Sequence, residues 1–292
     1  MAQLLNFTSG GEVMERTSTF NDFFMAKRSF DVQFYLLFSQ AILVKLMFVV
    51  FAKGARAIVD KKAWKKQFIA LNKRTWTAMG VDFGDDETWY QAALFNFPLS
   101  FHHLVGGLLC VPSVFGVPGI SKEVAFALAR HGALFETAWE FQDIVTRFYQ
   151  FIFKENWRKL NPPGLLKILA IHHACGMCAV IPMNLYFGNS VLYHESIFLL
   201  QGAAGISIGS QSYAYTLDLK KDSDVFKYKI LSLIVLAVIL YTRVFRFFSL
   251  GLELATLMYG SNFAIFALAM AASSLMSIFN VLLLLDALKK IS

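Results

Sequence analysis

Apolar stretches long enough to cross a lipid bilayer recur along almost the whole chain, and they limit the fold more than any other feature. A transmembrane helix needs about 20 consecutive, mostly apolar residues. The 292-residue sequence is 57% hydrophobic and only 16% charged, an excess that a soluble core of this size does not need. We therefore predict an all-α fold, a polytopic membrane bundle of about seven transmembrane helices. The predicted spans are 32–52, 89–111, 124–152, 165–187, 195–217, 229–250 and 262–285.

The third predicted span differs from the others because it is rich in ionisable residues. Charged side chains are costly in hydrocarbon, and where they occur in spans they face a bundle interior or an aqueous cavity. Four of them recur at intervals of three or four residues, which places them on one face of a helix. We therefore expect the other helices to surround this span. The four residues are Glu136, Glu140, Asp143 and Arg147.

Basic residues predict the direction of the chain through the membrane. Lysines and arginines gather after the first, third and fifth spans and at the carboxyl terminus, whereas the segments 112–121, 188–194 and 251–261 contain none. The positive-inside rule then places the carboxyl terminus in the cytosol. The predicted organisation is a lumenal tail at 1–31, a first transmembrane helix at 32–52, a basic cytosolic interfacial segment at 53–88, a six-helix transmembrane domain at 89–285 and a cytosolic tail at 286–292.

The net charge and two short motifs bear on partners and compartment. A formal charge of +7 in the loops suits an anionic membrane surface better than nucleic acid. We therefore expect membrane lipids and protein partners within the membrane, and no nucleic acid. Asn6-Phe7-Thr8 is a glycosylation acceptor pattern, which requires a lumenal tail. The ending Lys289-Lys290-Ile291-Ser292 matches a dilysine retrieval signal or is a lysine pair that stops the last span. We expect the endoplasmic reticulum, with another organelle membrane as the alternative.

Histidine pairs in two spans are candidates to meet the polar face of the third span. His102 and His103 lie in the second span, and His172 and His173 lie in the fourth. A carboxylate such as Asp143 can orient one ring nitrogen of a histidine and leave the other to act as a base or nucleophile. Adjacent residues on a helix point about 100° apart, so we expect one histidine of each pair in the site. The alternative is a buried polar network that fixes the helix register.

Metal and haem sites are weaker alternatives. One histidine from each pair could ligate a haem, and His172, Cys175 and Cys178 share a helix face that could offer soft ligands. A single helix cannot supply a tetrahedral site, however, and the sequence indicates no fourth ligand. We therefore expect no bound metal and no tightly bound cofactor.

Short motifs in the second to sixth spans resemble those of the TLC-domain family, in the same order. The histidine pair of the fourth span and the following His-Glu-Ser are the most specific of them. The resemblance covers roughly residues 88–285. The motifs are Asn96-Phe97-Pro98-Leu99-Ser100-Phe101-His102-His103, Glu140-Phe141-Gln142-Asp143-Ile144-Val145, Leu169-Ala170-Ile171-His172-His173, His194-Glu195-Ser196 and Tyr241-Thr242-Arg243-Val244-Phe245.

The resemblance implies a helical bundle of the endoplasmic reticulum that acts on membrane lipids. The best-known enzymes of this family are ceramide synthases. Carried over, His172, His173, Asp143 and Glu195 would be catalytic, and His102, His103, Glu140 and Arg243 would bind substrate. Phe198 and Gln201 stand where the ceramide synthase motif has acidic residues. The chain is therefore more similar to the branch with a glutamate-serine pattern than to true ceramide synthases.

Two functions from different classes follow from these observations. The first is an N-acyltransferase that makes ceramide from a long-chain base, with acyl-CoA as its co-substrate. The second is a protein without catalytic activity, either a lipid-binding protein, a cargo receptor or a structural membrane subunit of a larger complex. Loss of the two acidic positions counts against the enzyme.

Overall fold

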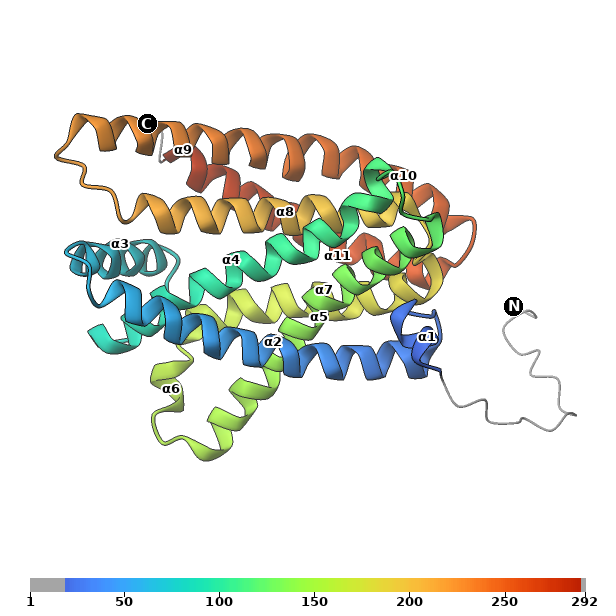
Figure 1. The fold of residues 1–292 in the computed structure, drawn as a ribbon, viewed down its shortest axis with the longest axis horizontal. Helices are drawn as coiled ribbons and strands as arrows, with labels where there is room; N and C mark the ends of the chain where they lie inside the picture. Colours follow the sequence, from blue (N-terminus) through green and yellow to red (C-terminus); the bar gives the residue numbers. More distant parts are fainter. Residues whose placement is uncertain (1–18, 290–292) are drawn as a thin grey trace, which may run out of the picture.

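The computed structural model describes residues 19–289, which form helices joined by short loops, with no strand in that range (Figure 1). The predicted all-α fold is confirmed. Asn6 of the glycosylation pattern and Lys290 of the dilysine ending lie outside the described residues. The elements are α1 (Phe20–Phe24), α2 (Phe30–Val59), α3 (Lys65–Ala78), α4 (Asp86–Phe115), α5 (Lys122–Phe153), α6 (Trp157–Leu160), α7 (Pro163–Phe187), α8 (Val191–Ala214), α9 (Asp222–Ile239), the π-helical turn η1 (Leu240–Phe245), α10 (Arg246–Tyr259) and α11 (Phe263–Lys289).

Six helical segments are long and apolar enough to cross a membrane: α2, α4, α7, α8, the continuous run α9–η1–α10, and α11. Large apolar side chains cover their outer faces, as on α2, where Ile42, Leu46 and Val50 are each about 60% exposed. Exposing such an apolar surface to water is unfavourable, whereas contact with lipid acyl chains is favourable. The chain is therefore an integral membrane protein.

Two predicted boundaries need correction. Helix α2 continues to Val59, so the predicted interfacial segment 53–88 contains the end of α2, all of α3 and the start of α4. The predicted loop 251–261 is helical as far as Tyr259. Glu253 lies in that helical part and pairs with Arg246, at 2.9 Å between Oε1 and Nη1. This ion pair explains how a charged residue is accommodated within the span instead of in a loop.

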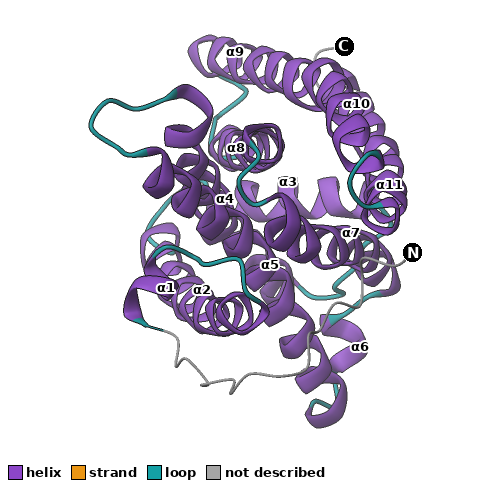
Figure 2. Ribbon diagram, turned by 90° about the vertical axis from the view of Figure 1, so that its right-hand side faces the viewer, coloured by secondary structure: helices purple, strands orange, loops and turns teal. Residues whose placement is uncertain are grey.

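Helix α5, the polar third span of the prediction, lies in the middle of the bundle. It packs against α2, α4 and α7 and runs from one end of the bundle to the other (Figures 1 and 2). Its ionisable residues Arg130, Glu136, Glu140 and Asp143 are all buried. The expectation that other helices surround this span holds up to Asp143, whereas Phe148, Phe151 and Phe153 near the end of α5 are exposed.

The closest helix pair is α4 with α8, and small residues allow the approach. A Cβ atom on Gly107 of α4 would lie 3.1 Å from the backbone nitrogen of Gly202 on α8. A Cβ atom on Gly205 would lie 2.7 Å from Cγ of Leu104. Larger residues at these positions would push the two helices apart, so glycine here fixes the position of α4 and the histidines it carries.

Basic connections that the sequence placed on one side lie at one end of the bundle. Lys159 after α5 pairs with Asp85 before α4, at 2.5 Å between Nζ and Oδ2. Gln67 of α3 donates to the carbonyl of Leu217, in the loop after α8. The carboxyl end of α11 points to the same end (Figure 1). Basic loops alternate along the sequence with loops that lack lysine and arginine. This alternation matches the alternating direction of the helices.

Candidate functional site

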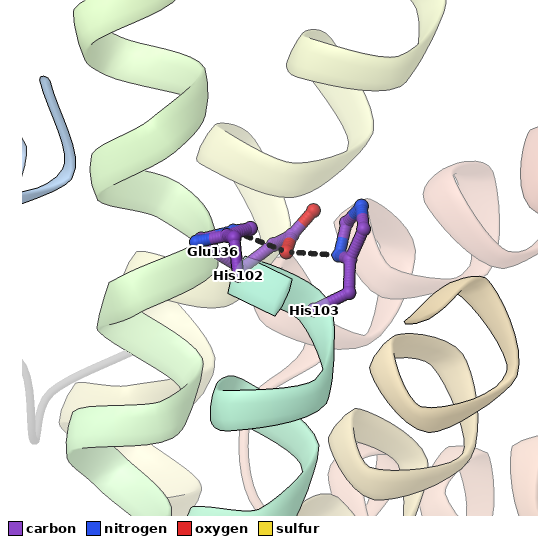
Figure 3. A group of neighbouring side chains, drawn as sticks. All are labelled: His102, His103 and Glu136. Carbon is purple, nitrogen blue, oxygen red and sulfur yellow. Dashed lines mark hydrogen bonds and ion pairs between the residues drawn. The ribbon is translucent and has the colours of Figure 1, made fainter. Parts of the chain in front are cut away.

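A buried carboxylate, Glu136 on α5, is the centre of the polar cluster in the bundle (Figure 3). Its Oε2 lies 3.2 Å from Nε2 of His102 and 3.0 Å from Nδ1 of His103, both on α4. Its other oxygen, Oε1, lies 3.5 Å from Nε2 of His172 on α7. One side chain thus connects three helices. Sequence reasoning placed Glu136 on the polar face of its helix but did not choose it as a site residue.

Asp143, two turns further along α5, forms a second polar group with His173. Nε2 of His173 lies 2.9 Å from Oδ2 of Asp143, which confirms the predicted pairing of this aspartate with a histidine. Arg147 donates to both Asp143 oxygens, at 2.6 and 3.0 Å, and Nη1 of Arg147 donates to Oδ1 of Asn161 at 2.6 Å. A bidentate arginine fixes the orientation of the aspartate.

The indole ring of Trp139 fills the space between the two groups. It contacts all four histidines, with ring centroids 5.9 Å from His102 and His103, 5.7 Å from His172 and 5.3 Å from His173. Sequence reasoning missed Trp139, although it follows Glu136 by three residues and precedes Asp143 by four. The helical spacing that selected the charged residues selects this ring too.

A cavity of about 1170 Å³ reaches the cluster from between α4, α5, α7, α8 and the carboxyl-terminal helices. His103 and His172 line it, whereas His102 packs against Phe48 and Phe135 and His173 bonds to Asp143. One histidine of each pair faces the cavity, but all four contact Glu136 or Asp143, so the expectation that only one of each pair belongs to the site was wrong. The remaining wall is largely apolar and includes Trp76, Met79, Phe83, Ile168, Ile197, Val235, Leu254 and Met276.

Gly176 on α7 makes room for the second glutamate, Glu140. A Cβ atom at position 176 would overlap the Glu140 carboxylate. Because glycine stands there, this carboxylate is buried against α7, and its Oε1 lies 3.7 Å from Nε2 of His172. His172 is thus placed between two carboxylates, Glu136 and Glu140. Nothing in the sequence marked Gly176, because the contact depends on the relative rotation of two helices.

Glu195 and Arg243, the two remaining predicted site residues, occupy different places. Glu195 forms a two-point ion pair with Arg246, at 2.5 and 2.6 Å, and belongs to a separate charged group with Glu253. The structure therefore does not bring Glu195 into contact with the histidines. Arg243 lines the cavity, donates to the carbonyl of Leu200 at 2.5 Å and lies 3.5 Å from Oδ1 of Asn280.

The π-helical turn η1 explains why Arg243 and Arg246 diverge. Residues three apart on a regular α-helix share a face, but a π turn accommodates one extra residue and rotates the helix beyond it. Arg243 belongs to η1 and faces the cavity, whereas Arg246 begins α10 and faces Glu195.

The described residues offer two sets of metal ligands, neither of which is the histidine-cysteine set that the sequence offered as a weaker alternative. They are His102, His103 and Glu136, and Glu136, Glu140 and His172. The candidate ligand atoms of each set lie within 4.8 Å of one another. Cys178 is exposed, and the side chain of Cys175 lies outside the described part of the structure.

No family model, curated protein or solved structure shows a significant match to this chain. The resemblance to the TLC-domain family stays a prediction from short motifs, and the function must be argued from the site itself.

Proposed function

We propose that this protein binds a membrane lipid in the central cavity, with the lipid's acyl chain along the apolar wall and its polar group against the histidine and carboxylate cluster. One observation carries the proposal: the cavity of about 1170 Å³ is apolar along most of its wall and has His103, Glu136, Glu140 and His172 at one place in it. Small-molecule sites are mostly apolar, with a few polar groups that fix orientation, and have volumes of about 300–1,000 Å³. A cavity at the top of that range suits a long ligand.

A pair of neighbouring positions on α8 provides the test. Ser207 lines the cavity, whereas Ile206 is exposed on the outer face of the same helix. Purified protein would be exposed to a lipid with a photoreactive acyl chain, and the crosslinked peptides identified by mass spectrometry. We expect crosslinks to cavity residues in the wild type and in Ile206→Trp, and a loss of at least fivefold in Ser207→Trp. Crosslinks confined to the outer faces of the wild type would contradict the proposal.

N-acyl transfer is a second candidate, and the position of His172 favours it. This histidine is on the cavity wall, and two carboxylates lie near its Nε2. Carboxylates so placed can orient an imidazole that serves as a general base. In such a reaction the amine of a long-chain base attacks the thioester carbonyl of acyl-CoA. The C–N bond forms, the C–S bond breaks, coenzyme A leaves as the thiolate, and the amine proton passes to His172.

Product formation separates the two candidates. Purified protein given a long-chain base and acyl-CoA should release coenzyme A and ceramide in equal amounts if it is an acyltransferase. His172→Ala should then reduce the rate by at least 100-fold, a far larger loss than the decrease in lipid crosslinking in the same variant. Wild-type protein that takes up the photoreactive lipid but forms no product is a binding protein, a cargo receptor or a structural subunit.

We also propose a cytosolic carboxyl terminus and residence in the endoplasmic reticulum. The gathering of the basic connections at one end of the bundle supports the orientation. A protease-sensitive tag placed after Ser292 should be cleaved when protease is added to the outside of sealed microsomes, which is their cytosolic side. Protection of the tag would overturn both the orientation and the retrieval signal.

A further inference from the structure

We propose that His102, His103 and Glu136 form a binding site for a divalent transition-metal ion of the zinc class. Nε2 of His102, Nδ1 of His103 and Oε2 of Glu136 are its ligand atoms. The proposal concerns a different property from lipid binding and does not depend on it. Figure 3 shows the Glu136 carboxylate between the two imidazole rings.

The distances from Glu136 to the two histidine nitrogens match the coordination geometry of zinc. Zinc–nitrogen and zinc–oxygen bonds are about 2.0–2.2 Å long, so neighbouring ligand atoms of a tetrahedral site are separated by about 3.3 Å. Oε2 of Glu136 lies 3.2 Å from the His102 nitrogen and 3.0 Å from the His103 nitrogen. Small rotations of the side chains would admit an ion between them. Two histidines and a glutamate are also a known ligand set for zinc sites that keep one position open.

The chemistry around Glu136 suits a cation better than a simple hydrogen bond. Two imidazoles converge on one oxygen of the buried Glu136 carboxylate, which places two nitrogen donors and one oxygen donor around a single point. Glu140 lies one turn further on the same helix and is also buried, so two carboxyl groups are close together beside the cavity. The nearby guanidinium of Arg243 bonds to Leu200 and Asn280. A divalent ion at Glu136 matches the charge of the two carboxylates.

Neighbouring groups would support the site. Nε2 of His172, 3.5 Å from Oε1 of Glu136, is placed to hold the carboxylate while its other oxygen binds the ion. Such outer contacts orient ligands, and their loss reduces metal affinity by about 10–100-fold. His103 and Glu136 also line the cavity, so the fourth position of the ion would face it. His102, which packs against Phe48 and Phe135, closes the opposite side.

Metal content is the first test, with protein purified without a polyhistidine tag and without chelators. Mass spectrometry of the elements should find about one zinc-class ion per chain. After removal of the metal with a chelator, titration with Zn²⁺ should again saturate at one ion per chain, and Co²⁺ should give the visible absorption of a tetrahedral site. Wild-type protein that holds no ion and binds no Zn²⁺ at micromolar concentration overturns the proposal.

Variants locate the site. The double variant His102→Gln, His103→Gln should lower Zn²⁺ affinity by at least 100-fold, and His172→Ala by 10–100-fold. The matched control is His131→Gln, which removes a histidine of α5 whose ring nitrogens contact Gln40 and the carbonyl of Phe24. Unchanged affinity in the double variant would place any bound ion elsewhere and contradict the proposal. If the double variant fails to fold, the stoichiometry and the Co²⁺ spectrum of the wild type decide.

Discussion

Two buried polar clusters on α5 differ in how completely their hydrogen bonds are satisfied. Near the start of the helix, Arg130 donates from Nε to the carbonyl of Ala26 at 2.8 Å and from Nη2 to the carbonyl of Met25 at 2.6 Å. Its Nη1 donates to the carbonyl of Gly188 at 3.0 Å. Near the middle of the helix, Glu136 meets imidazoles beside a cavity.

Arg130 is enclosed by backbone acceptors from two segments, the turn before α2 and the loop between α7 and α8. The predicted lumenal tail is therefore fixed to the bundle where it joins α2. By contrast, Nδ1 of His102 and Nε1 of Trp139 are buried and have no hydrogen-bond partner among the described residues. Buried polar groups are nearly always satisfied. A buried charge is therefore common to both clusters, whereas the unsatisfied groups beside the cavity distinguish the cluster around Glu136.

The largest effect on stability should come from the cluster around Arg130. Arg130→Met leaves several buried carbonyls without a donor, and we expect the free energy of unfolding to fall by about 3 kcal/mol. Thermal unfolding in lipid nanodiscs measures it. The control is Arg74→Met, because Arg74 is exposed on α3. Equal unfolding temperatures for the two variants would show that the Arg130 contacts contribute little.

The cluster around Glu136 and Glu140, beside the cavity, should be sensitive to added side-chain volume. Gly176→Ala places a methyl group where the Glu140 carboxylate lies, so the carboxylate must move away from His172. We expect a loss of about 2 kcal/mol in stability and weaker lipid crosslinking. Gly54→Ala is the matched control, since a Cβ atom there meets open space within α2. A Gly176→Ala protein that is as stable as Gly54→Ala would argue against the tight packing of Glu140.

A substitution in the ion pair of Glu195 tests whether this residue contributes to stability alone or also to catalysis. Glu195→Gln weakens a partly exposed two-point contact with Arg246, for which we expect a loss of about 1 kcal/mol in stability. Lipid crosslinking and metal content should stay at wild-type levels, because Glu195 contacts neither the histidines nor Glu136. A large loss of acyl transfer in this variant would restore the catalytic role that the family resemblance implies.

The smallest effect concerns a surface ion pair at the other end of the bundle. A hydrogen bond from Lys159, with others from Thr88, lowers the pKa of Asp85 below its ordinary value. As the pH falls below about 4, the unfolded chain protonates this aspartate first, so its stabilising contribution decreases and is lost once the pH passes the folded pKa. Unfolding measured between pH 5 and 2 should therefore depend less on pH in Asp85→Asn. An identical pH dependence in the two proteins would contradict this role.

The sequence predicts the features that are set by composition or by residue spacing within a single helix. The apolar spans, the burial of α5 and the shared face of Glu136, Glu140 and Asp143 follow from hydropathy and helical spacing. Contacts between helices depend on the rotation and depth of each helix, which spacing within one helix does not determine. The convergence of His102 and His103 on Glu136 and the space that Gly176 leaves for Glu140 could not be predicted for this reason.

The π turn at Leu240–Phe245 shifts the register of its helix by one residue, so the residues after it face different neighbours. One additional residue rotates everything after it by about 100°, so the part that carries Arg243 and the part that carries Arg246 present unrelated faces to their neighbours. A single deletion in the turn before Arg243, at residues 240–242, would restore regular α-helical spacing, bring the two arginines toward one face and separate at least one from its partners. Changes of length are therefore tolerated far less here than substitutions, and a one-residue gap in a related sequence would mark a bundle with a different cavity wall.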